Sequence, residues 1–241
     1  MKILAIGNSF SEDATRYLSA IARAQDERID VMNLYYPGCP LDRHYRNMLA
    51  NKAEYTLIFN GENTGIPITM EQALLSREWD AVTLQQVSRL SFRMDTYYPY
   101  ITALADYVRR CQPKAKIYLH QTWAYEEGCD RLREVAGYAH ASEMLSDIEK
   151  CYAEVAEREG FDGIIPSGSM LFALLENGIG SVHRDHFHAS RGLGRYALGL
   201  LWFRMLTGAS VAENRFCALD EPATPEEMAI ARRVVDSFDP L

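Results

Sequence analysis

The sequence has no run of basic residues and no long hydrophobic segment. Among 241 residues, 25 are Lys or Arg and 33 are Asp or Glu, so the net charge is −8. An acidic chain without a basic cluster is a poor candidate for binding nucleic acid or an anionic membrane. No stretch approaches the roughly 18 apolar residues of a membrane helix, and the apolar start MKILAIGNSF is too short for a signal peptide. We therefore expect a cytoplasmic protein with neither of these partners.

Cysteine is sparse and shows no pairing pattern. The five cysteines, with no CxxC pair among them, are Cys39, Cys111, Cys129, Cys151 and Cys217. Such wide spacing does not indicate a disulfide framework or a structural zinc site. We expect free thiols, and we expect Cys39 to be a small buried residue despite its place after a Pro-Gly turn.

What the sequence does contain is a regular alternation of short apolar runs and helical patterns. The predicted strands are Lys2–Gly7, Ile29–Gly38, Trp79–Gln86, Ala115–Trp123 and Phe161–Gly168. The predicted helices are about Ser11–Gln25 with Ser11 as a cap, Tyr100–Cys111, Ala141–Glu159, Gly192–Leu206, and a last one capped by Thr224. Strands separated by helices indicate βαβ units. We predict an α/β fold, a three-layer α/β/α sandwich around a central parallel sheet of about five strands, in one domain spanning residues 1–241.

Residues 51–78 fit this alternation least well. They include AEYTLIFNGENTGIPITMEQALL, which mixes an apolar run with a polar, Gly-containing stretch. We predict an insertion there, either a short β excursion or a lid, and expect it to shape a substrate pocket.

Polar residues follow the predicted strands at their carboxyl ends. Ligands of open parallel sheets bind beyond these ends, so the residues there are the candidates for a site. Strand by strand they are Asn8 and Ser9, Gly38 and Cys39, Gln85 and Gln86, and His120, Trp123 and Tyr125.

Ser9 and the segment SVHRDHFHAS, residues 181–190, have the most suggestive chemistry. Ser9 lies between a tight strand-to-helix turn and a helix N-terminus, which favours a nucleophile whose attack creates an oxyanion; helix capping is the alternative. Asp185 and His188 are three residues apart, so the carboxylate can orient the imidazole as a general base. The three histidines of this segment are also compatible with a metal site or with a solvated loop.

Taken together, these segments resemble the SGNH (GDSL-type) hydrolase superfamily over nearly the whole chain. The resemblance rests on AIGNSFS, GCPLDRH, WDAVTLQQ, TWAY and RDHFHAS in that order, and it is closest to a bacterial SGNH-like branch with GNSFS and a C-terminal DxxH. It implies an SGNH/flavodoxin-like fold and no cofactor. It also implies that Ser9 is the nucleophile, that His188 is the general base and later the acid, and that Asp185 orients His188.

The resemblance further implies an oxyanion hole that includes the backbone N–H groups of Ser9 and Gly38. The usual asparagine of the third block is absent, so Gln86 is the first choice for the missing donor and Gln85 the second. The residues expected to contact substrate are Asn8, Gln85, His120, Trp123 and Tyr125. For the two aromatic residues a packed rim under a loop is an equal alternative. Arg184 is a further candidate that could bind a carboxylate, with a plain surface position as its alternative.

The function predicted from the sequence is a serine ester hydrolase that removes an O-acyl group, such as acetyl, from a carbohydrate or small molecule. Two alternatives stay open. One is a metal-dependent hydrolase that uses HRDHFH together with His120. The other is a catalytically weak, carbohydrate-binding protein on the same fold. The acyl group, the alcohol and the oligomeric state are not predicted.

Overall fold

The computed structural model describes residues 1–241 and contains one seven-stranded sheet in the order β4-β3-β2-β1-β5-β6-β7. The strands are β1 (Lys2–Gly7), β2 (Asp30–Tyr35), β3 (Tyr55–Phe59), β4 (Glu62–Ile68), β5 (Ala81–Leu84), β6 (Lys116–His120) and β7 (Gly163–Ile165). The five neighbouring strands β2, β1, β5, β6 and β7 run parallel to one another. β3 pairs antiparallel with β2, and β4 pairs antiparallel with β3. The predicted α/β fold with a mostly parallel sheet is confirmed, and the five predicted strands are its parallel part.

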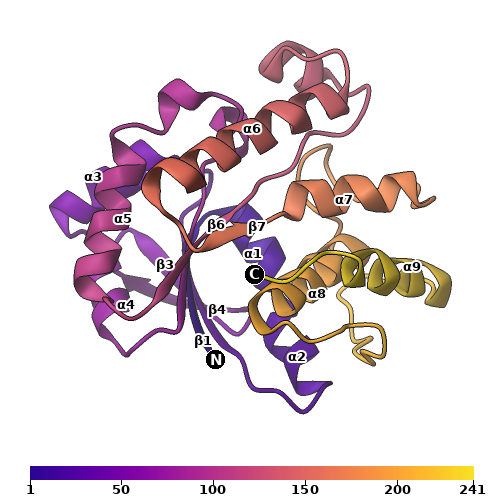
Figure 1. The fold of residues 1–241 in the computed structure, drawn as a ribbon, viewed down its shortest axis with the longest axis horizontal. Coiled ribbons are helices and arrows are strands. Elements are labelled where there is room, and N and C mark those ends of the chain that lie inside the picture. The colour runs from indigo at the N-terminus through magenta and orange to yellow at the C-terminus, as the bar shows by residue number, and fades with distance from the viewer.

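Helices cover both faces of the sheet, which gives three layers (Figure 1). One face carries α3 (Leu41–Ala50), α4 (Met70–Leu75), α5 (Tyr100–Cys111) and α6 (Ala141–Glu159). The other carries α1 (Ser9–Thr15), α2 (Leu18–Arg23), α7 (Ser167–Glu176), α8 (Leu193–Thr207) and α9 (Pro225–Asp236). None of these helices is both long and apolar enough to cross a membrane.

The predicted parallel strands are unbroken apolar runs because both faces of each strand are buried. Ile3 and Ala5 of β1 pack into the core beneath α8, while Leu4 and Ile6 pack into the core beneath α5. Side chains alternate between the two faces of a strand, so each parallel strand supplies both cores.

Residues 51–78 form the β excursion at one edge of the sheet. β3 pairs with β2 and turns back as β4, and α4 follows with Thr69 as its N-cap. The hairpin therefore widens the sheet by two strands beyond the five that were predicted.

The helix expected over Ser11–Gln25 is divided into α1 and α2, and it begins earlier than predicted. Asn8 is the N-cap of α1, since its side-chain Oδ1 accepts the N–H of Phe10 at 3.0 Å. The Ser11 hydroxyl instead contacts the Asn8 carbonyl at 2.9 Å and Asn33 Oδ1 at 3.0 Å. Ser11 is thus not the cap, and Ser9 occupies the first helical position, where backbone N–H groups have no partner within the helix.

Candidate active site

A cavity of about 330 Å³ lies at the carboxyl ends of the parallel strands. Ser9 enters it from the end of β1, Gly38 from the loop after β2, and His188 from the loop before α8. These segments are remote in sequence, and the parallel topology brings them together at the carboxyl ends of the strands. No residue of 51–78 lines this cavity, so the expected contribution of the hairpin to the pocket is absent.

Ser9, His188 and Asp185 form one line of hydrogen bonds. His188 Nε2 lies 2.8 Å from Ser9 Oγ, and His188 Nδ1 lies 2.8 Å from Asp185 Oδ2. The other Asp185 oxygen accepts the backbone N–H of His188 at 2.8 Å. Donation from Nδ1 to the carboxylate leaves Nε2 as the acceptor facing the serine hydroxyl, the tautomer that a general base requires.

The carboxylate of Asp185 stays ionised in this position. Partial burial by itself raises its pKa, but the hydrogen bonds from the His188 ring and backbone, together with the nearby charges of His188 and Arg184, outweigh burial and hold the pKa below its ordinary value. Asp185 therefore presents a negative charge to the imidazole, and such a charge favours the protonated form of the ring.

Ser9 and Gly38 both line the cavity, which makes their backbone N–H groups the candidates for oxyanion donors. The N–H of Gly38 donates no hydrogen bond within the protein, and Ser9 is at the N-terminus of α1. Gly38 has φ +58°, a left-handed conformation that a residue with a Cβ adopts only with strain. The loop after β2 therefore favours a glycine at this position.

Gln86 does not reach the cavity, which corrects the prediction of an oxyanion donor. Its Nε2 donates to the carbonyl and hydroxyl oxygens of Thr96, at 3.1 and 3.2 Å. Its Oε1 accepts the N–H groups of Leu41 and Val87. Gln86 is buried and joins the loop after β5 to the start of α3 and to Thr96, so its amide has no donor left for substrate.

Gln85, Asn8 and His120 form a buried chain beneath Ser9, and of the three only Asn8 lines the cavity. Gln85 Nε2 donates to Asn8 Oδ1 at 2.9 Å, and Gln85 Oε1 lies 3.0 Å from His120 Nδ1. The three side chains are at most 2% exposed. Burial lowers the pKa of His120 to about 3, so its imidazole is neutral. This hydrogen-bonded chain holds Asn8, the N-cap of α1, in place. Gln85 also packs closely on Gly7, because a Cβ on Gly7 would lie 2.6 Å from Gln85 Oε1.

Trp123 and Tyr125 are packed rather than exposed to the cavity. Trp123 stacks on Phe10 with ring centroids 3.8 Å apart and donates to the Phe187 carbonyl. Tyr125 is fully buried with its ring edge against Phe187. The aromatic surface that faces Ser9 is therefore that of Phe10 and Phe187, which Trp123 and Tyr125 support from below.

The remaining histidines of HRDHFH do not converge with His188. His183 Nε2 lies 3.1 Å from the Ala124 carbonyl, and His186 Nδ1 lies 2.6 Å from Glu126 Oε2. No three His, Cys, Asp or Glu side chains in the protein are grouped as metal ligands would be. This geometry gives no support to the alternative of a metal-dependent hydrolase built on the segment.

Asp13 is a residue of the site that the sequence did not reveal. Its carboxylate is fully buried and contacts Arg184 Nη1 at 3.0 Å and Arg195 Nε at 2.8 Å, and it also accepts the N–H of Ala189. Asp13 thereby attaches α1 to the loop that carries His188. Its arginine partners are more than 170 positions away in the sequence, so no local pattern around Asp13 indicates them.

Cys39 is buried, and burial raises the pKa of its thiol to about 12. A thiol with so high a pKa holds almost no thiolate near neutral pH, so Cys39 is not poised as a nucleophile.

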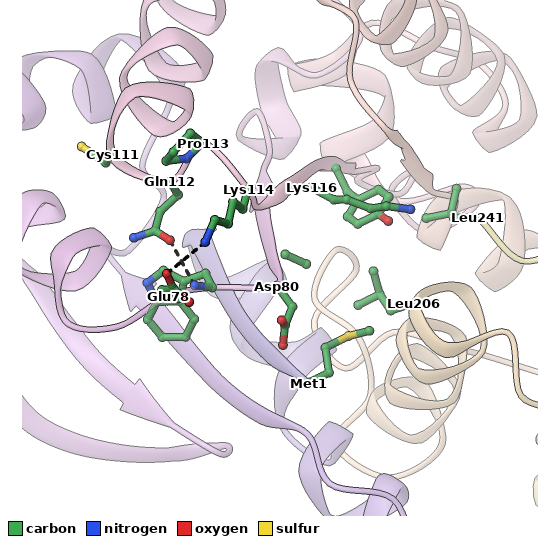
Figure 2. A pocket seen from close by; sticks show the side chains of 13 residues that line it. Met1, Glu78, Asp80, Cys111, Gln112, Pro113, Lys114, Lys116, Leu206 and Leu241 are labelled. Atoms are coloured by element: carbon green, nitrogen blue, oxygen red, sulfur yellow. Dashed lines mark hydrogen bonds and ion pairs between the residues drawn. The ribbon is translucent and has the colours of Figure 1, made fainter.

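A larger cavity, of about 550 Å³, lies at the amino ends of the parallel strands, and Figure 2 shows the residues that line it. Met1, Asp80 and Lys116 line it at the amino ends of β1, β5 and β6. The dashed lines in the figure mark an exposed Lys114–Glu78 ion pair and a Trp79–Gln112 hydrogen bond. It lies away from the carboxyl ends of the strands and contains no nucleophile–base pair, so size alone does not identify the site.

Comparisons with known proteins agree with this fold. Residues 2–235 match the profile of a family described as a domain of unknown function, DUF4886. No curated protein matches the chain. A DUF4886 family protein from Bacteroides uniformis superposes with a TM-score of 0.92 at 31% identity, over 98% of this chain and 93% of that one.

Two more distant structures share the fold. A candidate SGNH hydrolase from Slackia heliotrinireducens has a TM-score of 0.60 at 21% identity, over 85% of this chain and 97% of its own. The acetylxylan esterase Axe2 from Geobacillus stearothermophilus has a TM-score of 0.53 at 14% identity, over 84% and 90%.

Proposed function

This chain belongs to the DUF4886 family and has the fold of SGNH hydrolases, and we propose that it is a serine ester hydrolase. The observation that carries the proposal is the line of hydrogen bonds from Asp185 through His188 to Ser9 Oγ. A serine hydroxyl paired with an oriented imidazole at a helix N-terminus is the arrangement that activates a weak nucleophile.

In the proposed reaction, His188 Nε2 takes the proton of Ser9 as Oγ attacks the ester carbonyl. The carbonyl oxygen becomes an oxyanion that the N–H groups of Ser9 and Gly38 stabilise. His188 then gives the proton to the departing alcohol, which leaves an acyl group on Ser9. Water, deprotonated by His188, attacks the acyl-enzyme and releases the acid and the free serine.

This oxyanion hole has two backbone donors and no side-chain amide, since both glutamines after β5 are engaged elsewhere. Removal of one such donor costs about 10²–10³ in rate in other serine hydrolases. We therefore expect turnover on simple esters to be slower than that of hydrolases with a third donor.

The proposed substrate is an O-acylated carbohydrate or small molecule, most simply an acetyl ester. Among the proteins of similar fold, Axe2 is named as an acetylxylan esterase, which supports an acetyl ester on a carbohydrate. The cavity of about 330 Å³ beside Ser9 accommodates a small acyl group together with part of its alcohol.

The test is a panel of p-nitrophenyl esters and acetylated sugars given to the wild-type protein and to Ser9→Ala. We expect Ser9→Ala to lose at least about 10³-fold in kcat/KM and to lose labelling by a fluorophosphonate probe. Cys39→Ala is the matched control, because it removes a thiol next to Gly38, which lines the cavity, and is expected to keep both properties. Equal hydrolysis or equal labelling of Ser9→Ala and wild type would show that the nucleophile is misassigned.

A further inference from the structure

The cavity beside Ser9 is lined by basic residues in a protein that is acidic as a whole. Arg89, Arg131 and Arg184 line it, and Glu12 is the only acidic residue to do so. The chain carries 33 Asp and Glu against 25 Lys and Arg. Three arginines at one small cavity therefore run against the charge balance of the chain.

Two of these arginines have no carboxylate partner. Arg184 is already paired with the buried Asp13, whereas neither Arg89 nor Arg131 has a carboxylate oxygen within 4.0 Å. Arg89 is exposed, and its Nη1 donates only to the Gly38 carbonyl, at 3.3 Å. Its guanidinium therefore lies beside the residue that offers the second oxyanion donor.

Arg131 is held in place by aromatic stacking. Its guanidinium carbon lies 3.9 Å from the centroid of the Phe187 ring and 5.3 Å from that of Tyr125. Its Nε is buried without a hydrogen-bond acceptor. A guanidinium fixed on aromatic faces loses little further freedom when it binds an anion, and its planar fork suits the two oxygens of a carboxylate.

We propose that the ester substrate carries an anionic group, such as a carboxylate, that Arg89 and Arg131 bind while Ser9 attacks the ester carbonyl. The inference rests on the proposed hydrolase function and narrows its substrate class to acidic esters. Charge-assisted hydrogen bonds from arginine are stronger than neutral ones, and they orient the ligand as well as attract it.

Glu12 faces the same cavity and opposes an anionic substrate. Its pKa is above the ordinary value, because burial and the neighbouring Asp13 raise it more than Arg195, Arg184 and His188 lower it. Since a charged Glu12 repels an anion, its replacement by a neutral residue should strengthen the preference for an anionic substrate.

The test compares kcat/KM for matched anionic and neutral esters. On the alcohol side the pair is 3-acetoxybenzoate and 3-acetoxybenzamide, and on the acyl side it is the 4-nitrophenyl esters of glutarate and pentanoate. In at least one pair the anionic ester is expected to be favoured by about 10-fold or more. Arg89→Gln and Arg131→Met should each lower that ratio by about 10-fold, and Glu12→Gln should raise it.

Arg28→Gln is the control, because Arg28 lies just before the amino end of β2, away from the cavity, and its side chain is 86% exposed. This substitution should not change the ratio. Arg89 is exposed, so Arg89→Gln remains a fair test even if Arg131→Met is unstable. Unchanged ratios in Arg89→Gln, or no preference for the anion in either pair, would overturn the anion site while leaving the esterase in place.

Binding to Ser9→Ala separates the two proposals. Calorimetric titration should show tighter binding of 3-acetoxybenzoate than of 3-acetoxybenzamide, or of the glutarate over the pentanoate ester, whether or not the wild type hydrolyses them. A wild type that cleaves no ester, together with this binding preference, would remove the hydrolase and keep the anion site. Equal binding within both pairs would contradict the anion site directly.

Discussion

Asp185 and Asp13 both hold the loop that carries His188, and they do so in opposite environments. The Asp185 side chain is 45% exposed and binds the His188 ring and backbone. The Asp13 side chain is fully buried and binds two arginines and the Ala189 N–H. The loop thus uses two carboxylates: the partly exposed Asp185 binds the His188 imidazole, and the buried Asp13 holds the loop in position.

The difference follows from the partners. Arginine keeps its charge at all accessible pH values, so a buried carboxylate such as Asp13 is always matched. His188 gains and loses a proton in the proposed reaction, and a carboxylate that is partly solvated tolerates this change. Chemistry and loop position are therefore assigned to different acids, and each substitution below tests that division.

The largest effect is expected for Asp185→Asn. The amide cannot stabilise the imidazolium and favours the wrong tautomer of His188, so kcat/KM should fall by about 10²–10⁴-fold. Because the side chain is nearly half exposed, the midpoint of thermal unfolding should change little. Ester hydrolysis and a thermal melt of the same preparation check both parts. A large loss of stability with intact activity would reverse the roles assigned to the two aspartates.

Asp13→Asn is expected to act mainly on stability. It leaves Arg184 and Arg195 without their buried counter-charge, and breaking such a pair costs about 3–5 kcal/mol in the free energy of unfolding. Urea denaturation measures the change. Asp42→Asn is the control, because Asp42 pairs only with Arg46 and its side chain is 36% exposed, so its loss should cost only about 1 kcal/mol. Equal costs for the two variants would show that burial of Asp13 is not what matters.

The sequence predicted the parallel strands, Ser9 and the DxxH pair because each depends on short-range patterns. Buried parallel strands are continuous apolar runs, and the carboxyl ends of such strands meet at one edge. The position of Ser9 and the local turn from Asp185 to His188 follow from a few neighbouring residues.

The roles of Asp13 and of the two glutamines could not be obtained in this way. Asp13 acts through arginines at the far end of the chain. Alternation along a strand would point Gln85 and Gln86 to opposite faces, but β5 ends at Leu84, so a period of two does not apply to them. Both side chains are buried, and they bind residues of segments that are remote in the sequence or on the next turn of the chain.

Gln86→Ala tests whether the division between chemistry and position extends to the loop after β5. The side chain joins Leu41, Val87 and Thr96, so its loss should cost about 1–3 kcal/mol of unfolding free energy by leaving buried groups without partners. Measured at a temperature where the variant is fully folded, kcat should fall far less than the 10²–10³-fold expected for an oxyanion donor. A loss of that size in a stable variant would restore Gln86 to the oxyanion hole.

The smallest effect concerns the pH dependence of stability. Asp185 has a pKa lower in the folded protein than the ordinary value of about 3.9, so its ionised form is favoured by folding. Its contribution to stability is present above that ordinary value and is lost as the pH falls through the folded pKa. Wild type should therefore melt slightly above Asp185→Asn at pH 6, and the gap should close below about pH 4. Asp239→Asn, at an exposed position near the C-terminus, should show no such gap at either pH. A gap that widened in acid would mean that the protonated form of Asp185 is the one that folding favours, which is incompatible with a carboxylate held for the His188 imidazole.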